Sequence, residues 1–93
     1  MIRTIKCRET ERIFNMENSK KLPKDIHQRG YMKLRMLHNA ASIEDLRVPP
    51  ANRLEKLSGN REGQYSIRIN DQWRICFRWI AGDAYDVEIK DYH

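Results

Sequence analysis

The C-terminal half of the chain places three arginines, Arg68, Arg74 and Arg78, at alternating positions of two consecutive runs. A guanidinium group stays charged and binds phosphate through two parallel hydrogen bonds. The pattern therefore favours contact with a phosphate-bearing ligand, and Arg74, in mid-run, should be held most rigidly. A merely solvated face is the alternative, because most charged side chains on a sheet lie exposed without a further role.

Groups able to transfer protons stand at the end of the chain, in the sequence Asp91-Tyr92-His93. An imidazole acts as acid or base near neutral pH, and a tyrosine can donate a hydrogen bond or stack on a base. Such groups, together with guanidinium clamps, suffice to cleave RNA without a metal, by attack of a 2′-OH on the adjacent phosphate. A frayed and inert terminus is the alternative.

A further cation, Arg61, lies in the glycine-containing loop 59–63, ahead of the alternating runs. Phosphate contact is one interpretation of this arginine. A structural pair with Glu62 inside a turn is the other, and it is equally compatible with the sequence.

Metal, nucleotide-cofactor and serine-hydrolase chemistry find no support in the sequence. His27, His38 and His93 are scattered, and Cys7 and Cys76 are too far apart for a metal-ligand motif. Phosphate-loop, dinucleotide-binding and nucleophile-elbow motifs are missing as well. We therefore expect no metal and no cofactor, and we interpret the two cysteines as packing thiols of a reducing cytoplasm.

The composition is that of one small basic domain spanning residues 1–93. Lys and Arg number 18 against 13 Asp and Glu, which gives a formal net charge of +5 and a pI of about 9.5. A basic surface attracts polyanions, so nucleic acid is the first partner to consider, with simple solubility as the alternative. The sequence shows neither a signal peptide nor an apolar run long enough for a membrane span, so we expect a cytoplasmic protein without a membrane partner.

The N-terminal half predicts one strand and two helices. Residues 1–6 indicate the strand and residues 8–18 a short first helix. A second helix is expected after Pro23, with one apolar face. A capping signal at Ser42 predicts a short third turn as far as Arg47, which the following prolines end. The apolar face of the second helix comprises Ile26, Gly30, Leu34, Leu37 and Ala41.

The C-terminal half changes to a period of two, which predicts half-buried strands over 65–69, 73–79 and 85–89, preceded by a strand at 53–57. Tight turns at 70–71 and 81–83 predict an antiparallel meander. The whole is an α+β domain whose helices cover the apolar face of the sheet. The other face should present Ser66, Arg68, Arg74, Arg78, Asp86 and Glu88.

The second half resembles the HigB family of toxins in the RelE superfamily. The residues that carry the resemblance are the loop 59–63, the run QYSIRINDQWRICFRW at 64–79, and the tail from Gly82 to the terminal DYH. The likeness is close over residues 48–93, and the strand–helix–helix order expected before them agrees with the family.

The resemblance implies a compact RelE-like domain with two helices packed on a mainly antiparallel sheet. It implies an endoribonuclease, a toxin that cleaves mRNA in the ribosomal A site without a metal. The implied partners are a HigA-type helix-turn-helix antitoxin and, through the antitoxin complex, operator DNA.

Family members place functional side chains at positions that match Arg61, Arg74 and the tail residues Asp91, Tyr92 and His93. Arg68 and Arg78, on the arginine-bearing face, are expected to bind RNA together with Arg61.

Two positions depart from the family pattern. Glu55 stands where well-studied members carry a histidine, and Ser58 stands where they carry a lysine. Glu55 could act as the base if arginines screen its charge, and Tyr92 is the alternative base, with His93 as acid or phosphate clamp. Lys56 could supply the missing cation, although it should leave the opposite side of the strand from Glu55. A slower nuclease is one consequence of these departures.

Two other functions stay open at this point. A ParE-like toxin of the same superfamily would poison DNA gyrase, and a non-catalytic module would use the basic face only to bind an antitoxin or operator DNA. The arginine-bearing face and the tail favour RNA over DNA gyrase.

Overall fold

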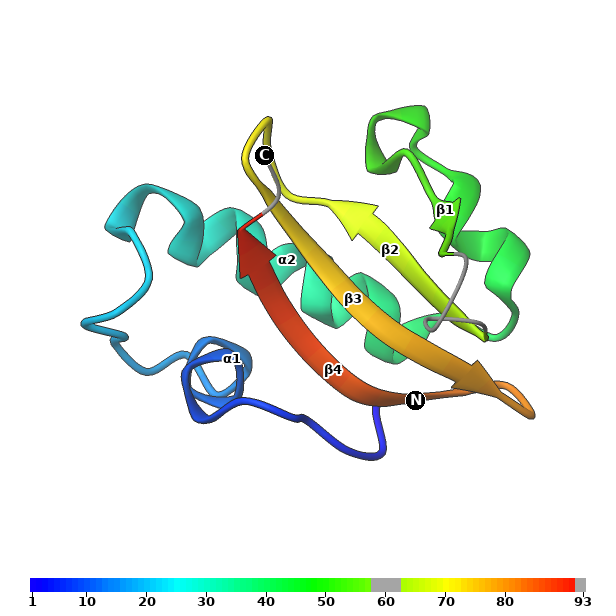
Figure 1. Ribbon diagram of the computed structural model, residues 1–93, viewed down its shortest axis with the longest axis horizontal. Coiled ribbons are helices and arrows are strands. Elements are labelled where there is room, and N and C mark those ends of the chain that lie inside the picture. Colours follow the sequence, from blue (N-terminus) through cyan, green and yellow to red (C-terminus); the bar gives the residue numbers. More distant parts are fainter. Residues whose placement is uncertain (58–62, 92–93) are drawn as a thin grey trace.

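The alternating runs of the C-terminal half form an antiparallel meander at the centre of the molecule (Figure 1). The computed structural model describes residues 1–57 and 63–91. Its four strands follow one another in chain order across a single sheet. They are β1 (Glu55–Lys56), β2 (Gln64–Arg68), β3 (Trp73–Ile80) and β4 (Asp83–Asp91).

The two described turns of the meander follow from their side chains. Between β2 and β3, the side-chain oxygen of Asn70 accepts hydrogen bonds from the backbone N–H groups of Gln72 and Trp73, at 2.9 and 2.8 Å. Between β3 and β4, Ala81 and Gly82 have φ angles of +51° and +85°. Positive φ at both central residues is the geometry of a two-residue hairpin whose twist matches its strands.

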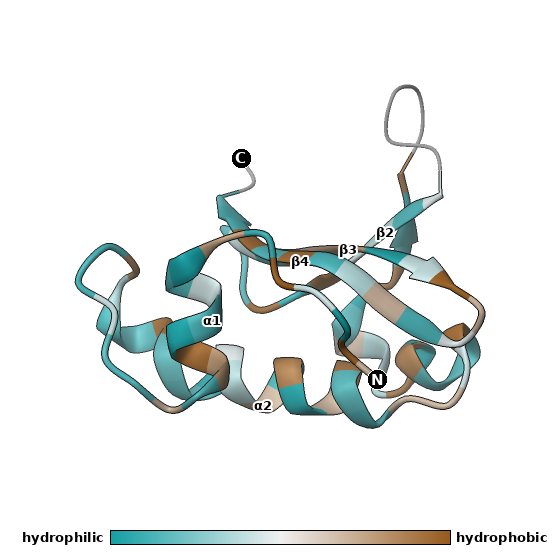
Figure 2. Ribbon diagram, turned by 90° about the horizontal axis from the view of Figure 1, so that it is seen from below, coloured by the Kyte–Doolittle hydropathy of each residue, from teal (hydrophilic) through white to brown (hydrophobic). Residues whose placement is uncertain are grey.

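All the helices lie on one side of the sheet, so its other face is not covered by any helix of the described chain (Figure 2). The α-helices are α1 (Arg8–Phe14) and α2 (His27–Asn39). Three short 3₁₀ segments complete this layer: η1 (Lys24–Ile26), η2 (Ile43–Arg47) and η3 (Pro50–Asn52). The expected α+β architecture is confirmed.

The core lies between the sheet and α2, and its residues come from the positions that the two periodicities select. Leu34 and Leu37 of α2 and Ile67 and Ile75 of the sheet are each 0% exposed. Burial of apolar surface on this scale, about 25 cal/mol per Å², holds the two layers together. The remaining buried apolar residues of the cluster are Ile13, Ile26, Ala40, Leu46, Ile69, Phe77, Ala84, Val87 and Ile89.

The prediction of a regular strand over residues 1–6 is wrong. Residues 1–6 run parallel to β4 but make only two isolated bridges, Ile2 to Ala84 and Ile5 to Val87. Between the bridges, the N–H of Asp86 donates to Oγ1 of Thr4 at 2.8 Å instead of continuing the ladder. The interruption follows from a bulge in β4, where Asp86 has φ +53° and the pairing with β3 shifts register.

Because of the same bulge, the β4 residues that face the core differ from those expected. Ala84 and Val87, three residues apart, are both fully buried, so Ala84 takes the core position expected for Tyr85. Tyr85 pairs with Arg78 across the strands and is half-buried, which places its ring on the uncovered face. A bulged residue in the left-handed conformation shifts the alternation by one position, and no period-two pattern can anticipate it.

The first helix ends four residues earlier than expected, at Phe14. Met16 adopts φ +62°, and the N–H groups of Met16 and Glu17 bond the carbonyls of Ile13 and Arg12. This pair of bonds is a Schellman cap, which usually takes glycine at the left-handed position. Because methionine occupies it here, the sequence carries no stop signal at this point.

Two further elements are smaller than expected. The strand predicted over 53–57 pairs with β2 only at Glu55 and Lys56. The turn after α2 is the 3₁₀ segment η2, and the N–H of Ser42 donates to the carboxylate of Asp45 at 3.1 Å. The capping signal is therefore confirmed, although the helix it begins is not an α-helix.

Gly30 sits in α2 at a point where an added methyl group would fit. A Cβ there would lie 3.7 Å from each of Ile13, Ile69 and Ile89, which is ordinary van der Waals contact. We expect Gly30→Ala to raise the free energy of unfolding by about 1 kcal/mol, the difference in helix propensity. Gly30→Leu should instead lower it by about 1–3 kcal/mol, because its larger side chain overpacks the same space. Urea denaturation measures both, and a destabilised alanine variant would contradict the contact geometry.

Candidate active site

A row of three cations crosses the uncovered face of the sheet. Arg68 of β2 pairs with Arg74 of β3, and Arg74 pairs with Lys90 of β4. Directly paired residues of antiparallel strands project to the same face with Cβ atoms about 5 Å apart. Three like charges in one row are costly unless anions compensate them, so the row attracts carboxylates or phosphates.

Arg74 is the buried centre of this row, with only 7% of its surface exposed. Its Nε donates to Oγ of Ser66 at 2.9 Å, and one terminal nitrogen donates to the carbonyl of Arg53 at 2.6 Å. The other terminal nitrogen lies 3.7 Å from a carboxylate oxygen of Glu55. A buried charge needs such partners, and these ones fix the guanidinium plane in one orientation.

The segment before β1 is held in place by a second buried polar group. Asn52 is 0% exposed, and its side-chain amide donates to the carbonyl of Leu46 at 3.2 Å, while its oxygen accepts from Lys33. Arg53 follows with φ +44°, which turns its carbonyl toward Arg74. The chain from η3 to β1 therefore presents Arg53 and Glu55 at the arginine row.

These groups line one open hollow of about 220 Å³. Three guanidinium groups stand against two carboxylates. Glu55 pairs with Arg74, and Asp71, 97% exposed, pairs with Arg68. Both carboxylates are exposed, Glu55 to 55%, so these ion pairs contribute only about 0–1 kcal/mol and a phosphate group can compete for the cations. The lining residues are Arg53, Glu55, Arg68, Asn70, Asp71 and Arg74.

The remaining described candidates lie outside this hollow. Arg78 is four residues along β3 from Arg74, about 13 Å at strand spacing, beside Gln64 and Tyr85. Lys56 pairs with Tyr65, whose ring stacks on buried Phe77, so Lys56 leaves the opposite face from Glu55, as expected.

Asp91 ends β4 opposite Trp73, one position past the cationic row. Its carboxylate accepts a hydrogen bond from Nε2 of Gln72 at 3.0 Å, and it does not line the hollow. Arg61, Ser58, Tyr92 and His93 lie outside the described residues, so their roles stay predictions.

Sequence reasoning missed two cations of this site. Lys90 could have been found, because it alternates with buried Ile89 and so belongs to the uncovered face. Arg53 could not, because it lies in irregular chain whose direction is set by a left-handed residue and a buried asparagine rather than by any periodicity.

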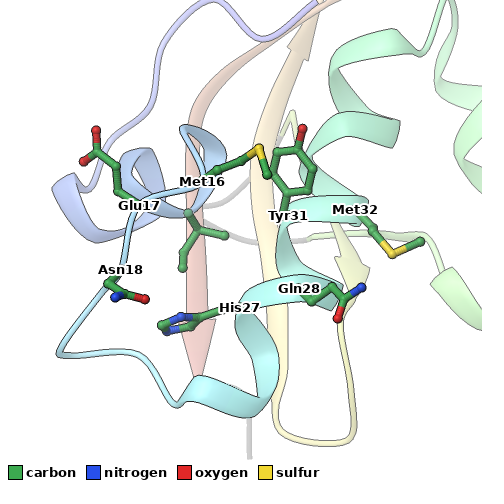
Figure 3. A pocket seen from close by; sticks show the side chains of 8 residues that line it. Met16, Glu17, Asn18, His27, Gln28, Tyr31 and Met32 are labelled. Carbon is green, nitrogen blue, oxygen red and sulfur yellow. The ribbon is translucent and has the colours of Figure 1, made fainter.

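A larger hollow, of about 430 Å³, lies between the end of α1 and the first half of α2 (Figure 3). It is mostly apolar, with Met16 and Met32 at its rim, and none of its lining side chains is a lysine or arginine. His27 lines it too, and its Nε2 bonds the carbonyl of Leu22 at 2.9 Å. This hollow is therefore separate from the arginine row.

Within residues 1–57 and 63–91, no three His, Cys, Asp or Glu side chains are placed to hold a metal ion. Over the same residues, no helix has both the length and the apolar character needed to cross a bilayer. Neither Cys7 nor Cys76 forms a disulfide.

Solved structures share this fold. YafQ from E. coli superposes with a TM-score of 0.60 at 9% identity, over 98% of this chain and 91% of that one. The toxin in a YoeB–YefM complex from Staphylococcus aureus gives a TM-score of 0.58 at 21% identity, over 100% and 95%. The α+β domain is thus the fold of these proteins.

Sequence comparison gives the family. The sequence-family model described as "RelE-like toxin of type II toxin-antitoxin system HigB" matches residues 4–93, and the chain belongs to this family. Endoribonuclease HigB of Proteus vulgaris is 32% identical over 93 residues, all of both chains. Toxin HigB-1 of Vibrio cholerae serotype O1 is 44% identical over 63 residues, 68% of this chain and 66% of that one. The family expected from the sequence is confirmed.

The contacts of Arg74 predict that substitution of Ser66 lowers the free energy of unfolding more than substitution of Glu55 does. Ser66→Ala should lower the free energy of unfolding by about 1.5–3 kcal/mol, because it leaves a buried charged N–H without its closest acceptor. Glu55→Gln should change it by less than about 1 kcal/mol, because Glu55 is 55% exposed. Equal effects of the two substitutions in urea denaturation would show that Arg74 does not depend on Ser66.

Proposed function

We propose that this toxin is a metal-independent endoribonuclease that cleaves mRNA in the ribosomal A site. The observation that carries the proposal is the shared hollow of Arg68, Arg74 and Glu55, which sets two phosphate-binding cations beside a carboxylate on an uncovered face. The name of the Proteus relative, an endoribonuclease matched over its whole length, supports the same activity.

In the proposed reaction, Glu55 removes the proton of a 2′-OH, and the 2′ oxygen attacks the neighbouring phosphorus. Arg68 and Arg74 bind the non-bridging oxygens, on which negative charge accumulates. The bond to the 5′ oxygen breaks, and an acid returns a proton to that oxygen. The products are a 2′,3′-cyclic phosphate and a free 5′-OH.

Glu55 fits the role of base because Arg74 compensates its charge. A carboxylate alone would repel a phosphate, whereas the guanidinium at 3.7 Å lies close enough to attract both groups. For the acid we propose His93, with Tyr92 contacting the RNA and Asp91 supporting the tail. These residues directly follow Lys90, which ends the cationic row.

We propose Arg61, Arg78 and Lys56 as contacts of RNA outside the scissile phosphate. Of these, Arg78 has the arrangement best suited to the task, because half-buried Tyr85 stands opposite it on the uncovered face. A guanidinium beside an aromatic ring can hold a phosphate and stack a base at the same time.

Membership of a type II toxin–antitoxin family implies an antitoxin partner. We propose a HigA-type helix-turn-helix antitoxin, operator DNA bound through the complex, and the cytoplasm as the place where the toxin meets ribosomes. Gyrase inhibition and non-catalytic binding are the competing functions. A cleavage assay on purified ribosomes, run beside a supercoiling assay with gyrase, separates the three.

Deletion of Tyr92 and His93 tests the tail. Because β4 ends at Asp91, we expect the shortened chain to keep its thermal unfolding transition and its antitoxin binding while losing growth arrest on induction. Full toxicity of the shortened chain would overturn the assignment of the acid.

The base is tested by Glu55→Gln, which keeps the shape of the side chain and removes its ability to accept a proton. We expect mRNA cleavage on purified ribosomes to fall about 10²–10⁴-fold, the usual contribution of a general base. Asp71→Asn is the matched control, since it removes the other carboxylate of the same hollow and should leave the rate within a few fold. An unimpaired Glu55→Gln variant would contradict the mechanism.

A further inference from the structure

A second cationic hollow lies where α2 passes the turn between β2 and β3. Its volume is about 400 Å³, and its charged lining consists of Arg29, Lys33 and Arg68. The rest of the lining is Asn70 with Ala51 and Ile69, so no carboxylate faces this space. It differs in this respect from the hollow around Arg74, where two carboxylates balance three cations.

Arg29 and Lys33 are one helical turn apart on the same side of α2. Neither makes an ion pair with a carboxylate of the described residues. Arg29 donates only to the carbonyl of Ile69, at 3.4 Å, and Lys33 donates to the buried side chain of Asn52. Partial burial, with a further contribution from Arg29, lowers the pKa of Lys33. Asp25 lines a neighbouring hollow with both cations but forms no ion pair with either of them. The two cations are thus held together without a paired anion, and a bound anion would relieve their repulsion.

The two hollows adjoin each other. Arg68 and Asn70 line both of them, so a polyanion bound at Arg74 can pass Arg68 and reach Arg29 and Lys33 without leaving the surface. A nucleic acid strand carries a phosphate at every nucleotide, and this regular spacing suits two adjoining cationic sites.

We propose that Arg29 and Lys33, together with Arg68, bind a backbone phosphate of the RNA strand next to the one that is cleaved. The proposal rests on the function proposed above for the Arg74 hollow and adds to it a subsite on α2. The subsite takes no part in the chemistry. It positions the strand, because a second fixed phosphate restricts how the scissile bond can lie against Glu55.

Direct binding tests the subsite. The probe is a fluorescein-labelled single-stranded RNA dodecamer, titrated with the full chain at several salt concentrations. We expect Arg29→Gln combined with Lys33→Gln to weaken binding about tenfold and to reduce the slope of log K against log salt by about 0.7, the value for one lost phosphate contact. The single variant Arg29→Gln changes only an exposed side chain and leaves the contact of Lys33 with Asn52 intact, so it tests the subsite without disturbing the fold.

The matched control is Lys20→Gln with Lys21→Gln. It removes the same charge from exposed residues between α1 and α2, outside both hollows. If the control weakens binding as much, or if Arg29→Gln and the double variant both bind like wild type, the subsite is wrong. Tighter binding of a duplex DNA of the same length, lost in the double variant, would overturn its assignment to an RNA strand.

Ribosomal cleavage by the same variants distinguishes the two proposals. A subsite that positions the strand predicts a higher KM for Arg29→Gln with the identity of the cleaved bond unchanged. If the variants bind RNA more weakly but the wild-type chain does not cleave mRNA, the subsite is upheld and the nuclease is refuted. Normal cleavage with unchanged KM and binding would uphold the nuclease and refute the subsite.

Discussion

The buried guanidinium of Arg74 is the interaction on which the site depends. It ties β3 to Ser66 of β2 and to the backbone of Arg53, which belongs to a segment with little secondary structure of its own. Besides this group, β1 is held by two residues paired with β2, a backbone hydrogen bond from Leu57 to Gln64, and the buried Asn52 that precedes it. The same side chain is therefore both the support of the site and its central cation, because the burial that makes its hydrogen bonds strong also keeps it at the floor of the hollow.

Most of the architecture is predictable from the sequence because it depends on two simple periods. The inward positions of β2 and β3, and the buried Gly30, Leu34 and Leu37 of α2, are where the two-residue and 3.6-residue patterns place them. The prediction of Ala41 on the same face is wrong: it is exposed beyond the end of α2, and Ala40 is buried instead. The other errors occur where one residue takes a left-handed conformation that its type does not announce. Met16 ends α1, and Asp86 shifts the phase of β4, yet neither is a glycine. A pattern of hydrophobicity contains no information about such positions.

The site was predictable to a different extent. Residues on regular strands, Arg68 and Arg74, were identified from alternation and lie together. Arg78 satisfies the same alternation but lies too far along β3 to share the hollow, because alternation determines the face of a sheet and not the place on it. Arg53 and Arg29 come from the chain before β1 and from α2, so only the packing of those segments against the sheet brings them to Arg68. The sequence thus identifies part of the cationic site, and the tertiary structure adds Arg53 and Arg29 to it.

The short β1 and the bulged β4 also affect how the molecule behaves in a crowded solution. In the part of the chain that the structure describes, β1 offers two residues at one edge of the sheet, and residues 1–6 cover part of the other edge beside the bulge. A long, flat edge with unpaired N–H and C=O groups would recruit strands from neighbouring molecules. In residues 1–57 and 63–91 neither edge has that form, so the sheet offers neighbouring molecules little backbone to extend.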